Sequence, residues 1–248
     1  MSAVMRTLSW IWPPVLIVVA WEVLVTTGGY NAIIIPRPIT VIADIVGNPD
    51  VYVLDTVVTL RVAVIGLAIG LAAGLIAAIL AWWSRILAGM LTPIAVALFA
   101  VPSLAFIPVL AQVLGYSEAT VIAIAAIISF FPGFVFVSSG LRQLPDGAES
   151  LFASLGAGRR VRLLHLALPS TVPNLLLALR MSASTAVVAA VVAEYLMGTD
   201  GLGQAFVYHY KRFEMDRAFG IAIVIMLLSF AVFVITSWIE RMGRARWT

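Results

Sequence analysis

The sequence predicts an all-α integral membrane protein with about six membrane-spanning helices, built as a single domain over residues 1–248. Of these residues, 62% are hydrophobic and only 11% are charged, and the mean hydropathy is +1.10. Soluble domains are typically about 45–50% apolar and about 25% charged. The apolar residues exceed what one core could bury, so lipid must replace water over much of the surface. Most arginines lie beside apolar runs, as in the loops of membrane proteins.

Six apolar segments are long enough to cross the hydrocarbon layer of a bilayer, which takes about 20 helical residues. They lie near residues 10–27, 56–83, 86–114, 119–141, 173–197 and 218–238. No small-residue cleavage site is evident, so we expect the first segment to be retained as a membrane helix.

The loop after the first segment contains two closely spaced prolines, Pro36 and Pro38. These force an extended stretch. Residues 39–46, which follow them, are interpreted either as a short helix on the membrane face or as a plain linker.

The second segment carries three glycines at four-residue spacing, Gly66, Gly70 and Gly74. Small residues at this spacing lie on one helix face and let two helix backbones approach closely. We therefore expect this face to pack against another helix of the bundle. Trp82 and Trp83 end the segment where an aromatic belt would lie at the membrane interface.

Three prolines interrupt the third segment: Pro93, Pro102 and Pro108. Each removes a backbone donor and bends or breaks a helix. Inside a membrane the freed carbonyls need a neighbouring group or a water-filled path. Ser103 adds a polar group beside the second proline. The segment is interpreted either as part of a passage or as a kinked packing helix.

The fifth segment carries polar and charged residues among alanines: Arg180, Ser182, Ser184, Thr185 and Glu194. Small and hydroxylic residues suit a helix that packs tightly or lines a path. Charged groups within a membrane are costly unless they are paired, which makes them functional candidates. Glu194 lies near the outer end of the segment, so an alternative is that its carboxylate simply reaches the interface.

The distribution of lysine and arginine predicts that both chain termini lie inside. With this orientation, nine of the 15 cationic residues fall on the inner side and five on the outer side, with Arg180 inside a span. The positive-inside rule favours this arrangement. The polar stretch between the fourth and fifth segments, residues 145–173, then faces the cytoplasm.

The polar stretch 145–173 predicts two short helices joined at a glycine. Asp146 lies in a turn and can cap a first helix that runs through Leu155. Gly156 follows as a residue that takes a positive φ at low cost and ends this helix. A second helix over residues 159–166 is predicted to end before Pro169, because the residue preceding a proline leaves the α region.

The side chains of the polar stretch allow two interpretations. Leu151, Phe152 and Leu155 form an apolar edge on the first short helix, which faces either the bundle or a partner protein. The arginine cluster at residues 159–162 sets the membrane topology, whatever else it does.

The polar stretch resembles the cytoplasmic loop of permease subunits of binding-protein-dependent ATP-binding-cassette (ABC) importers. That loop has the pattern E-A-A, three residues, G, nine residues, I-x-L-P. Gly156 and residues 166–169 fit the second half of the pattern. The first half departs from it, since Ser150 stands at the place of the usual Glu, a Leu-Phe pair replaces the two alanines, and Glu149 is one position early.

The resemblance extends over nearly the whole chain. It is closest to the branch that imports nitrate, sulfonates, taurine, bicarbonate and certain vitamin precursors. IIIPRPITV resembles the first outer loop of that branch, and VPSLAFIPVLAQVLGYSEAT resembles its third and fourth spans. AEYLMGTDGLGQAF resembles the segment after its fifth span. The resemblance implies a type I ABC importer permease fold in the inner (cytoplasmic) membrane of a bacterium.

The resemblance also implies the partners of this chain. The chain would be the pore-forming subunit of an ATP-driven importer. It would pair with a second permease subunit, which we expect to be an identical copy. A cytoplasmic ABC ATPase dimer would bind ATP and Mg²⁺, so this chain itself would hold no cofactor and no metal. An external binding protein would deliver the solute, either a small anion (sulfonate, taurine, nitrate or bicarbonate) or a vitamin-precursor pyrimidine.

Carried over to this sequence, the resemblance assigns three groups of residues within this scheme. The loop at residues 143–172 contains the ATPase-coupling element, which comprises Glu149, Ser150, Leu151, Phe152, Ala153, Ser154, Leu155, Gly156, Ala157 and Gly158. The loop would be anchored by Leu166, Leu168 and Pro169. The candidate path residues are Pro102, Ser103, Pro108, Ser182, Ser184, Thr185 and Glu194.

Other function classes fit the residues less well. The sequence has no G-x-x-x-x-G-K-[ST] phosphate-binding motif, so the ATP chemistry must belong to another subunit. A stand-alone secondary carrier or channel is the alternative, although carriers usually contain internal repeats and we find none. His165 and His209 fall on opposite sides of the membrane and cannot share a metal site, which disfavours a membrane enzyme. The positive-inside rule explains why arginines lie beside the apolar segments, so the pI of about 9.6 does not indicate nucleic-acid binding.

Overall fold

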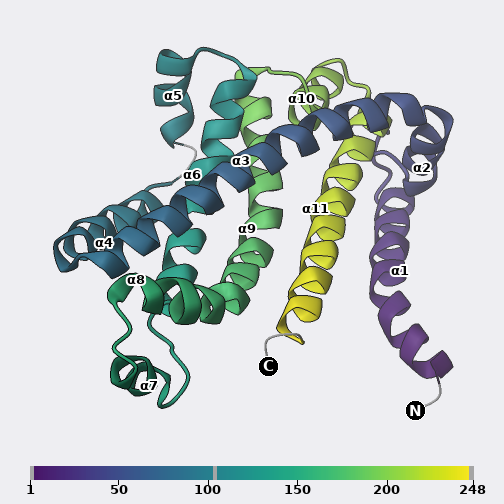
Figure 1. The fold of residues 1–248 in the computed structure, drawn as a ribbon. Helices are drawn as coiled ribbons and strands as arrows, with labels where there is room; N and C mark the ends of the chain where they lie inside the picture. Colours follow the sequence, from purple (N-terminus) through teal and green to yellow (C-terminus); the bar gives the residue numbers. More distant parts are fainter. Residues whose placement is uncertain (1–2, 103–104, 246–248) are drawn as a thin grey trace.

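The computed structural model describes residues 3–102 and 105–245, with side chains from Trp12 on. Figure 1 shows that these residues form a bundle of helices. The elements in chain order are α1 (Ala3–Thr27), α2 (Pro38–Gly47), α3 (Pro49–Trp83), α4 (Arg85–Ala100), α5 (Phe106–Leu114), α6 (Glu118–Gly140), α7 (Ala148–Ser154), α8 (Arg159–Arg162), the π-helical turn η2 (Leu163–Ala167), α9 (Leu168–Met197), α10 (Leu202–Lys211) and α11 (Met215–Arg244).

Four helical stretches of the described residues are long and apolar enough to cross a membrane. They are Pro49–Trp83, Glu118–Gly140, Arg159–Met197 and Met215–Arg244. Trp12–Thr27 of α1, together with α2 and α4, adds shorter apolar helices. The prediction of an all-α, multi-pass membrane protein is therefore confirmed.

The helices define two ends of the molecule (Figure 1). Helices α6, α9 and α11 stand side by side in this view, and α3 crosses in front of them and packs against α6 and α9. Both chain termini and α7 lie at one end, which we call the loop end. Helices α2 and α10 lie at the other end, which we call the opposite end. The six apolar segments of the sequence therefore return the chain to the side from which it started.

The glycine face of α3 packs directly against α6. A Cβ atom added to Gly66 would lie 2.5 Å from the Cβ of Ala125, and one added to Gly70 would lie 2.3 Å from the backbone oxygen of Ala126. Real Cβ atoms do not approach neighbours so closely, and only glycine permits this contact. The expected role of the glycine spacing in helix packing is confirmed.

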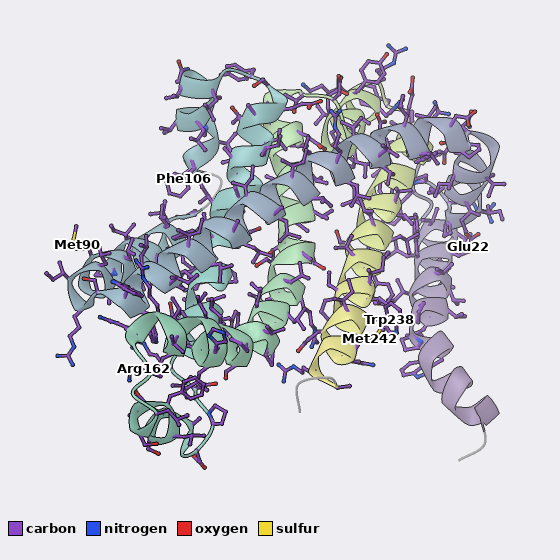
Figure 2. The ribbon with its side chains drawn as sticks, in the orientation of Figure 1. Glu22, Met90, Phe106, Arg162, Trp238 and Met242 are labelled. Carbon is purple, nitrogen blue, oxygen red and sulfur yellow. The ribbon has the colours of Figure 1, made fainter. Side chains whose placement is uncertain are left out.

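Helix α2 resolves the two interpretations of the loop after the first segment in favour of a short helix. It packs against α11, where the Arg217 guanidinium donates to Asp44 at 2.9 and 3.1 Å. The hydrogen bonds from Arg217 hold the pKa of the Asp44 carboxyl below its usual value. On α1, Glu22 (labelled in Figure 2) pairs with Arg37, which immediately precedes α2. Helix α2 is thus tied to both α1 and α11.

The third predicted segment is divided in two. Helix α4 ends at Ala100, and α5 begins at Phe106. Pro102 lies between them and cannot donate a helical hydrogen bond, which explains why the helix breaks there. Of the two effects expected of a proline here, a bend or a break, the structure shows a break at Pro102. At Pro93, by contrast, α4 continues through the proline.

The predicted end of the second short helix before Pro169 is wrong. Helix α8, η2 and α9 form one helical stretch, and Leu168 has helical angles of φ −64° and ψ −49°. The Leu168 N–H bonds to the backbone oxygen of Leu163, five residues back, rather than four. Proline normally clashes with the carbonyl four residues earlier, and this wider turn gives its ring room. The long helix therefore passes through Pro169.

Candidate functional site

Helix α7 projects from the loop end of the bundle, and an irregular segment of chain connects each of its ends to the bundle (Figure 1). It contains seven residues, none of them buried. Leu151 is 56% exposed and Leu155 is 73% exposed, while Phe152 is half-buried. Residues four apart share one helix face, so the two leucines present an apolar pair to the surroundings. The two leucines are therefore not packed against the bundle, whereas Phe152 is partly covered.

Gly156 ends α7 as the sequence predicts. Its φ is 69°, in the left-handed region that side chains other than glycine rarely enter. Its N–H bonds to the backbone oxygen of Ala153 at 3.0 Å, and the N–H of Ala157 bonds to that of Phe152 at 2.9 Å. These two bonds form the Schellman arrangement, which satisfies the last carbonyls of a helix.

The start of α7 differs from the prediction. Asp146 does not cap the helix, because Gly147 occupies the capping position with a φ of 75° and no side-chain bond caps the first turn. The hydroxyl of Ser150, at the place of the usual Glu of the family pattern, donates to the backbone oxygen of Gly147 at 2.8 Å. Glu149 lies 3.6 Å from Arg162 of α8, but its side chain is 70% exposed. Such exposed pairs contribute little stability.

Arg159 joins the loop to the end of α3. Its Nη2 donates to the backbone oxygen of Trp82 at 2.8 Å. Its guanidinium carbon also lies 5.3 Å from the ring centroid of Trp82 and 5.2 Å from that of Trp83. Cation–π contacts at these distances are attractive. Figure 2 shows Arg162 at the root of the loop, on the same short helix.

The predicted loop anchors all lie on the long helical stretch. Leu166 is buried and Leu168 and Pro169 are half-buried. Leu163 and Ala167 belong to an apolar cluster with residues of α3, α4 and α6, and Leu168 packs against this cluster. The return segment of the loop is therefore fixed to the bundle, while α7 is not.

A cavity of about 580 Å³ lies between α4, α5, α6 and α9. It brings together Pro102, Ser184 and Thr185, three of the candidate path residues from two distant segments. The rings of Phe99 and Phe131, which also line it, are stacked with centroids 4.1 Å apart at an angle of 15°. The remaining lining residues are Leu98, Ala100, Val101, Ile107, Ile124, Ile127, Ile128, Val188, Ala189 and Val192.

The other candidate path residues lie elsewhere. Pro108 is exposed on α5, next to the lining residue Ile107, and Ser182 is fully buried. Ser103 lies outside the described residues. The cavity therefore gathers part of the set that the sequence placed on the path.

Glu194 is fully buried at the junction of α9 and α10, so it does not reach the interface. Its Oε2 accepts from the Thr59 hydroxyl at 2.9 Å and from the Gly203 N–H at 3.0 Å. The Leu202 N–H in turn donates to the Thr59 hydroxyl oxygen at 2.9 Å. We call Glu194, Thr59 and Gly203 the Glu194 clasp, because they join α9, α3 and the start of α10.

Sequence reasoning missed Thr59 and Gly203. A Cβ on Gly203 would lie 2.0 Å from the backbone oxygen of Val191, so only glycine fits there. The glycines of the phrase GLG at residues 201–203 were the one available signal. Among the described residues, no three His, Asp or Glu side chains gather so as to hold a metal ion.

This chain is similar to known proteins over most of its length. A family model described as "Binding-protein-dependent transport system inner membrane component" matches residues 70–244. A probable ABC transporter permease protein of Haemophilus influenzae is 29% identical over 219 residues, covering 88% of this chain and 89% of the relative. A formylaminopyrimidine transport permease protein of Halalkalibacterium halodurans is 27% identical, covering 91% of this chain and 90% of the relative.

A more distant relative and a solved structure agree with this family. A putative aliphatic sulfonates transport permease protein of Bacillus subtilis is 25% identical, covering 77% of this chain and 70% of the relative. The fold is also similar to a crystal structure of an amino acid ABC transporter, with a TM-score of 0.68 and 16% identity. That alignment covers 81% of this chain and 97% of the other chain, and at this identity it shows the fold alone.

Proposed function

The chain belongs to the family of inner membrane components of binding-protein-dependent transport systems, and on this premise we propose that it is the pore-forming subunit of an ATP-driven importer. The loop end faces the cytoplasm and α7 contacts a separate ABC ATPase. A second copy of this chain completes the pore. An external binding protein delivers the solute at the opposite end. The names of the relatives, which are permeases rather than ATPases, support this division of labour.

The observation that carries the proposal is the exposed apolar pair of α7. Leu151 and Leu155 are held away from the bundle by two glycine-defined turns, at Gly147 and Gly156. An exposed apolar pair on a projecting loop supports a contact with another protein, because contact with an apolar groove would remove it from water. Arg159 and the buried return segment connect this surface to α3 and α9, so a partner that moves α7 acts on the spans.

The solute is one of the two classes that the sequence leaves open. Sulfonate transport by the Bacillus subtilis relative supports a small anion. Formylaminopyrimidine transport by the Halalkalibacterium halodurans relative supports a vitamin-precursor pyrimidine. Both relatives are similar over most of this chain, so similarity does not separate the two classes.

The proposal is tested by replacing Leu151 and Leu155 together with serine. Each leucine contributes about 1.5–3 kcal/mol when it moves from water into an apolar groove. Co-purification of the ATPase subunit and ATP hydrolysis stimulated by the binding protein should each fall by at least about tenfold, since tenfold corresponds to about 1.4 kcal/mol. Both are measured on the complete importer in proteoliposomes.

Val46 provides a matched control for this test. It is 73% exposed on α2, like Leu155, but it lies at the opposite end of the molecule. Val46→Ser should keep the ATPase subunit bound. Undiminished co-purification and stimulated hydrolysis in the double leucine variant would contradict the proposed role of α7.

A further inference from the structure

Another pocket lies at the root of the loop, where several helices end or begin. It has a volume of about 460 Å³ and lies between the end of α3, the chain that leaves α6 and the start of the long helical stretch. Trp82, Arg142, Glu149, Arg159 and Arg162 line it, together with apolar residues of the same segments. We call it the arginine pocket.

The arginines of this pocket are only partly paired. The Arg142 guanidinium is exposed and has no hydrogen-bond or ion-pair partner within the described part of the chain. Arg162 lies 3.6 Å from Glu149, beyond hydrogen-bond distance, and its Nε is buried without a partner among the described residues. Arg159 donates to the backbone oxygen of Trp82. Each guanidinium carries several N–H donors, so most of the donors around this pocket are unused.

The charges of the arginine pocket favour an anion with several oxygen atoms. Among the described residues that line it, Glu149 is the only acid, and its side chain is 70% exposed. One carboxylate therefore faces three guanidinium groups, which repel one another unless an anion lies between them. The planar fork of a guanidinium matches the oxygens of a phosphate, to which it donates paired, charge-assisted hydrogen bonds. The pocket thus suits a phosphate group.

The position of the pocket indicates where such a phosphate comes from. Helices α3 and α6 are both long and apolar enough to cross a membrane, and they end at Trp83 and Gly140. Trp82 lies next to the first of these ends, and Arg142 follows the second by two residues. The pocket is therefore level with the ends of two spans, where lipid headgroups lie and where tryptophan is enriched. Helix α7 projects further from the bundle (Figure 1).

We propose that the arginine pocket binds a phosphate group at the membrane surface, supplied by the headgroup of an anionic phospholipid. Basic pockets at the cytoplasmic ends of spans are suited to such headgroups. The phosphate oxygens accept from Arg142 and Arg162, while Arg159 is held against Trp82 and completes the positive wall. The bound headgroup joins the chain that leaves α6 to the return segment of the loop. This site depends neither on the solute nor on the ATPase of the proposed function.

The test measures lipid binding by native mass spectrometry, on the purified chain alone and on the chain assembled with its ATPase. The probes are phosphatidylglycerol, phosphatidylcholine and inorganic phosphate. Phosphatidylglycerol should bind at least about tenfold more tightly than phosphatidylcholine, a ratio that corresponds to about 1.4 kcal/mol, because the choline cation neutralises the phosphate. Both samples should hold it. Excess inorganic phosphate should not displace it, since the free ion lacks acyl chains that contact the apolar spans.

A pair of arginine variants tests the pocket directly. Arg142→Gln should weaken the binding of phosphatidylglycerol at least about tenfold, as for the loss of hydrogen bonds to a charged group. Its packing should be unchanged, because the Arg142 guanidinium has no partner in the described part of the chain. Arg160→Gln is the matched control, since Arg160 is exposed on α8 between Arg159 and Val161 and does not line the pocket. It should bind phosphatidylglycerol as the unmodified chain does, because salt screens a charge that makes no direct contact.

Each other outcome overturns the inference. Equal affinities for the two lipids, or equal losses in the two arginine variants, would show only a diffuse attraction to surface charge. Displacement by inorganic phosphate, with the same dependence on Arg142, would assign the pocket to a soluble phosphate. Binding that is lost on assembly with the ATPase would show that this subunit covers the pocket instead. ATP hydrolysis stimulated by the binding protein, which tests the proposed function, is measured separately, so the two proposals can fail independently.

Discussion

At the scale of single residues, Gly156 shows how backbone conformation shapes the loop. At its φ of 69°, a side chain with a Cβ costs roughly 1–2 kcal/mol. Gly156→Val should therefore distort the end of α7 and lower binding-protein-stimulated ATP hydrolysis. Gly156→Asn should be close to the unmodified protein, because asparagine enters the left-handed region far more readily. Equal hydrolysis by the valine variant and the unmodified protein would show that this turn does not matter for coupling.

Thr59 is the residue on which the Glu194 clasp depends. Thr59→Val would leave the Leu202 N–H without its acceptor and remove one donor from the buried carboxylate. A buried group without a partner costs about 1–3 kcal/mol, so the thermal midpoint of the purified protein should fall. Thr56→Val is the control, because the Thr56 hydroxyl donates only to the backbone oxygen of Tyr52. Identical midpoints for the two variants would contradict the importance of the clasp.

These two residues also mark what the sequence could predict at this scale. The position of Gly156 after a short polar helix predicted its conformation, because the requirement for positive φ is local. Thr59 is separated from Glu194 by 135 residues, and Glu194 alone was open to two interpretations. Its burial follows from the packing of three helices, which no local pattern specifies.

At the scale of elements, local rules about proline gave mixed results. Pro102 broke a helix, since α4 ends at Ala100 and α5 begins at Phe106. Pro169 did not, because the π-helical turn before it buries Leu163, Leu166 and Ala167. The rule for the residue before proline describes an isolated chain, and tertiary packing outweighed it here. The apolar segments other than the third were predicted as helices, since their length and composition are sufficient to identify them.

At the scale of the whole molecule, the two ends differ in the side of the membrane that they face. Because the sequence contains no cysteine, single-cysteine variants report accessibility without background. Val46→Cys should react with a membrane-impermeant maleimide on intact cells. Ser154→Cys, expressed without the ATPase subunit, should react only after the membrane is opened. Labelling of Ser154→Cys on intact cells would reverse the orientation and remove the basis for a cytoplasmic partner.

The whole-molecule arrangement was predictable in outline only. Composition and charge distribution indicated the membrane class and the return of the chain to its starting side. The cavity could not be predicted, because four helices contribute its walls and their relative rotation depends on contacts such as Gly70 with Ala126. The sequence placed Ser184 on a possible path but could not show that Ser229 engages its proton.

The length of helix α3 connects distant parts of the molecule. It contains 35 residues, with proline only in its first turn, and at 1.5 Å per residue it is about 52 Å long. It carries Thr59 about a third of the way along its length, and at its C-terminal end the carbonyl of Trp82 accepts from Arg159. A continuous helix without an internal break has no hinge that would let one end rotate independently of the other. A tilt imposed at the Trp82 end of α3 therefore also moves Thr59 and the start of the helix, so this one helix mechanically couples the two ends of the molecule.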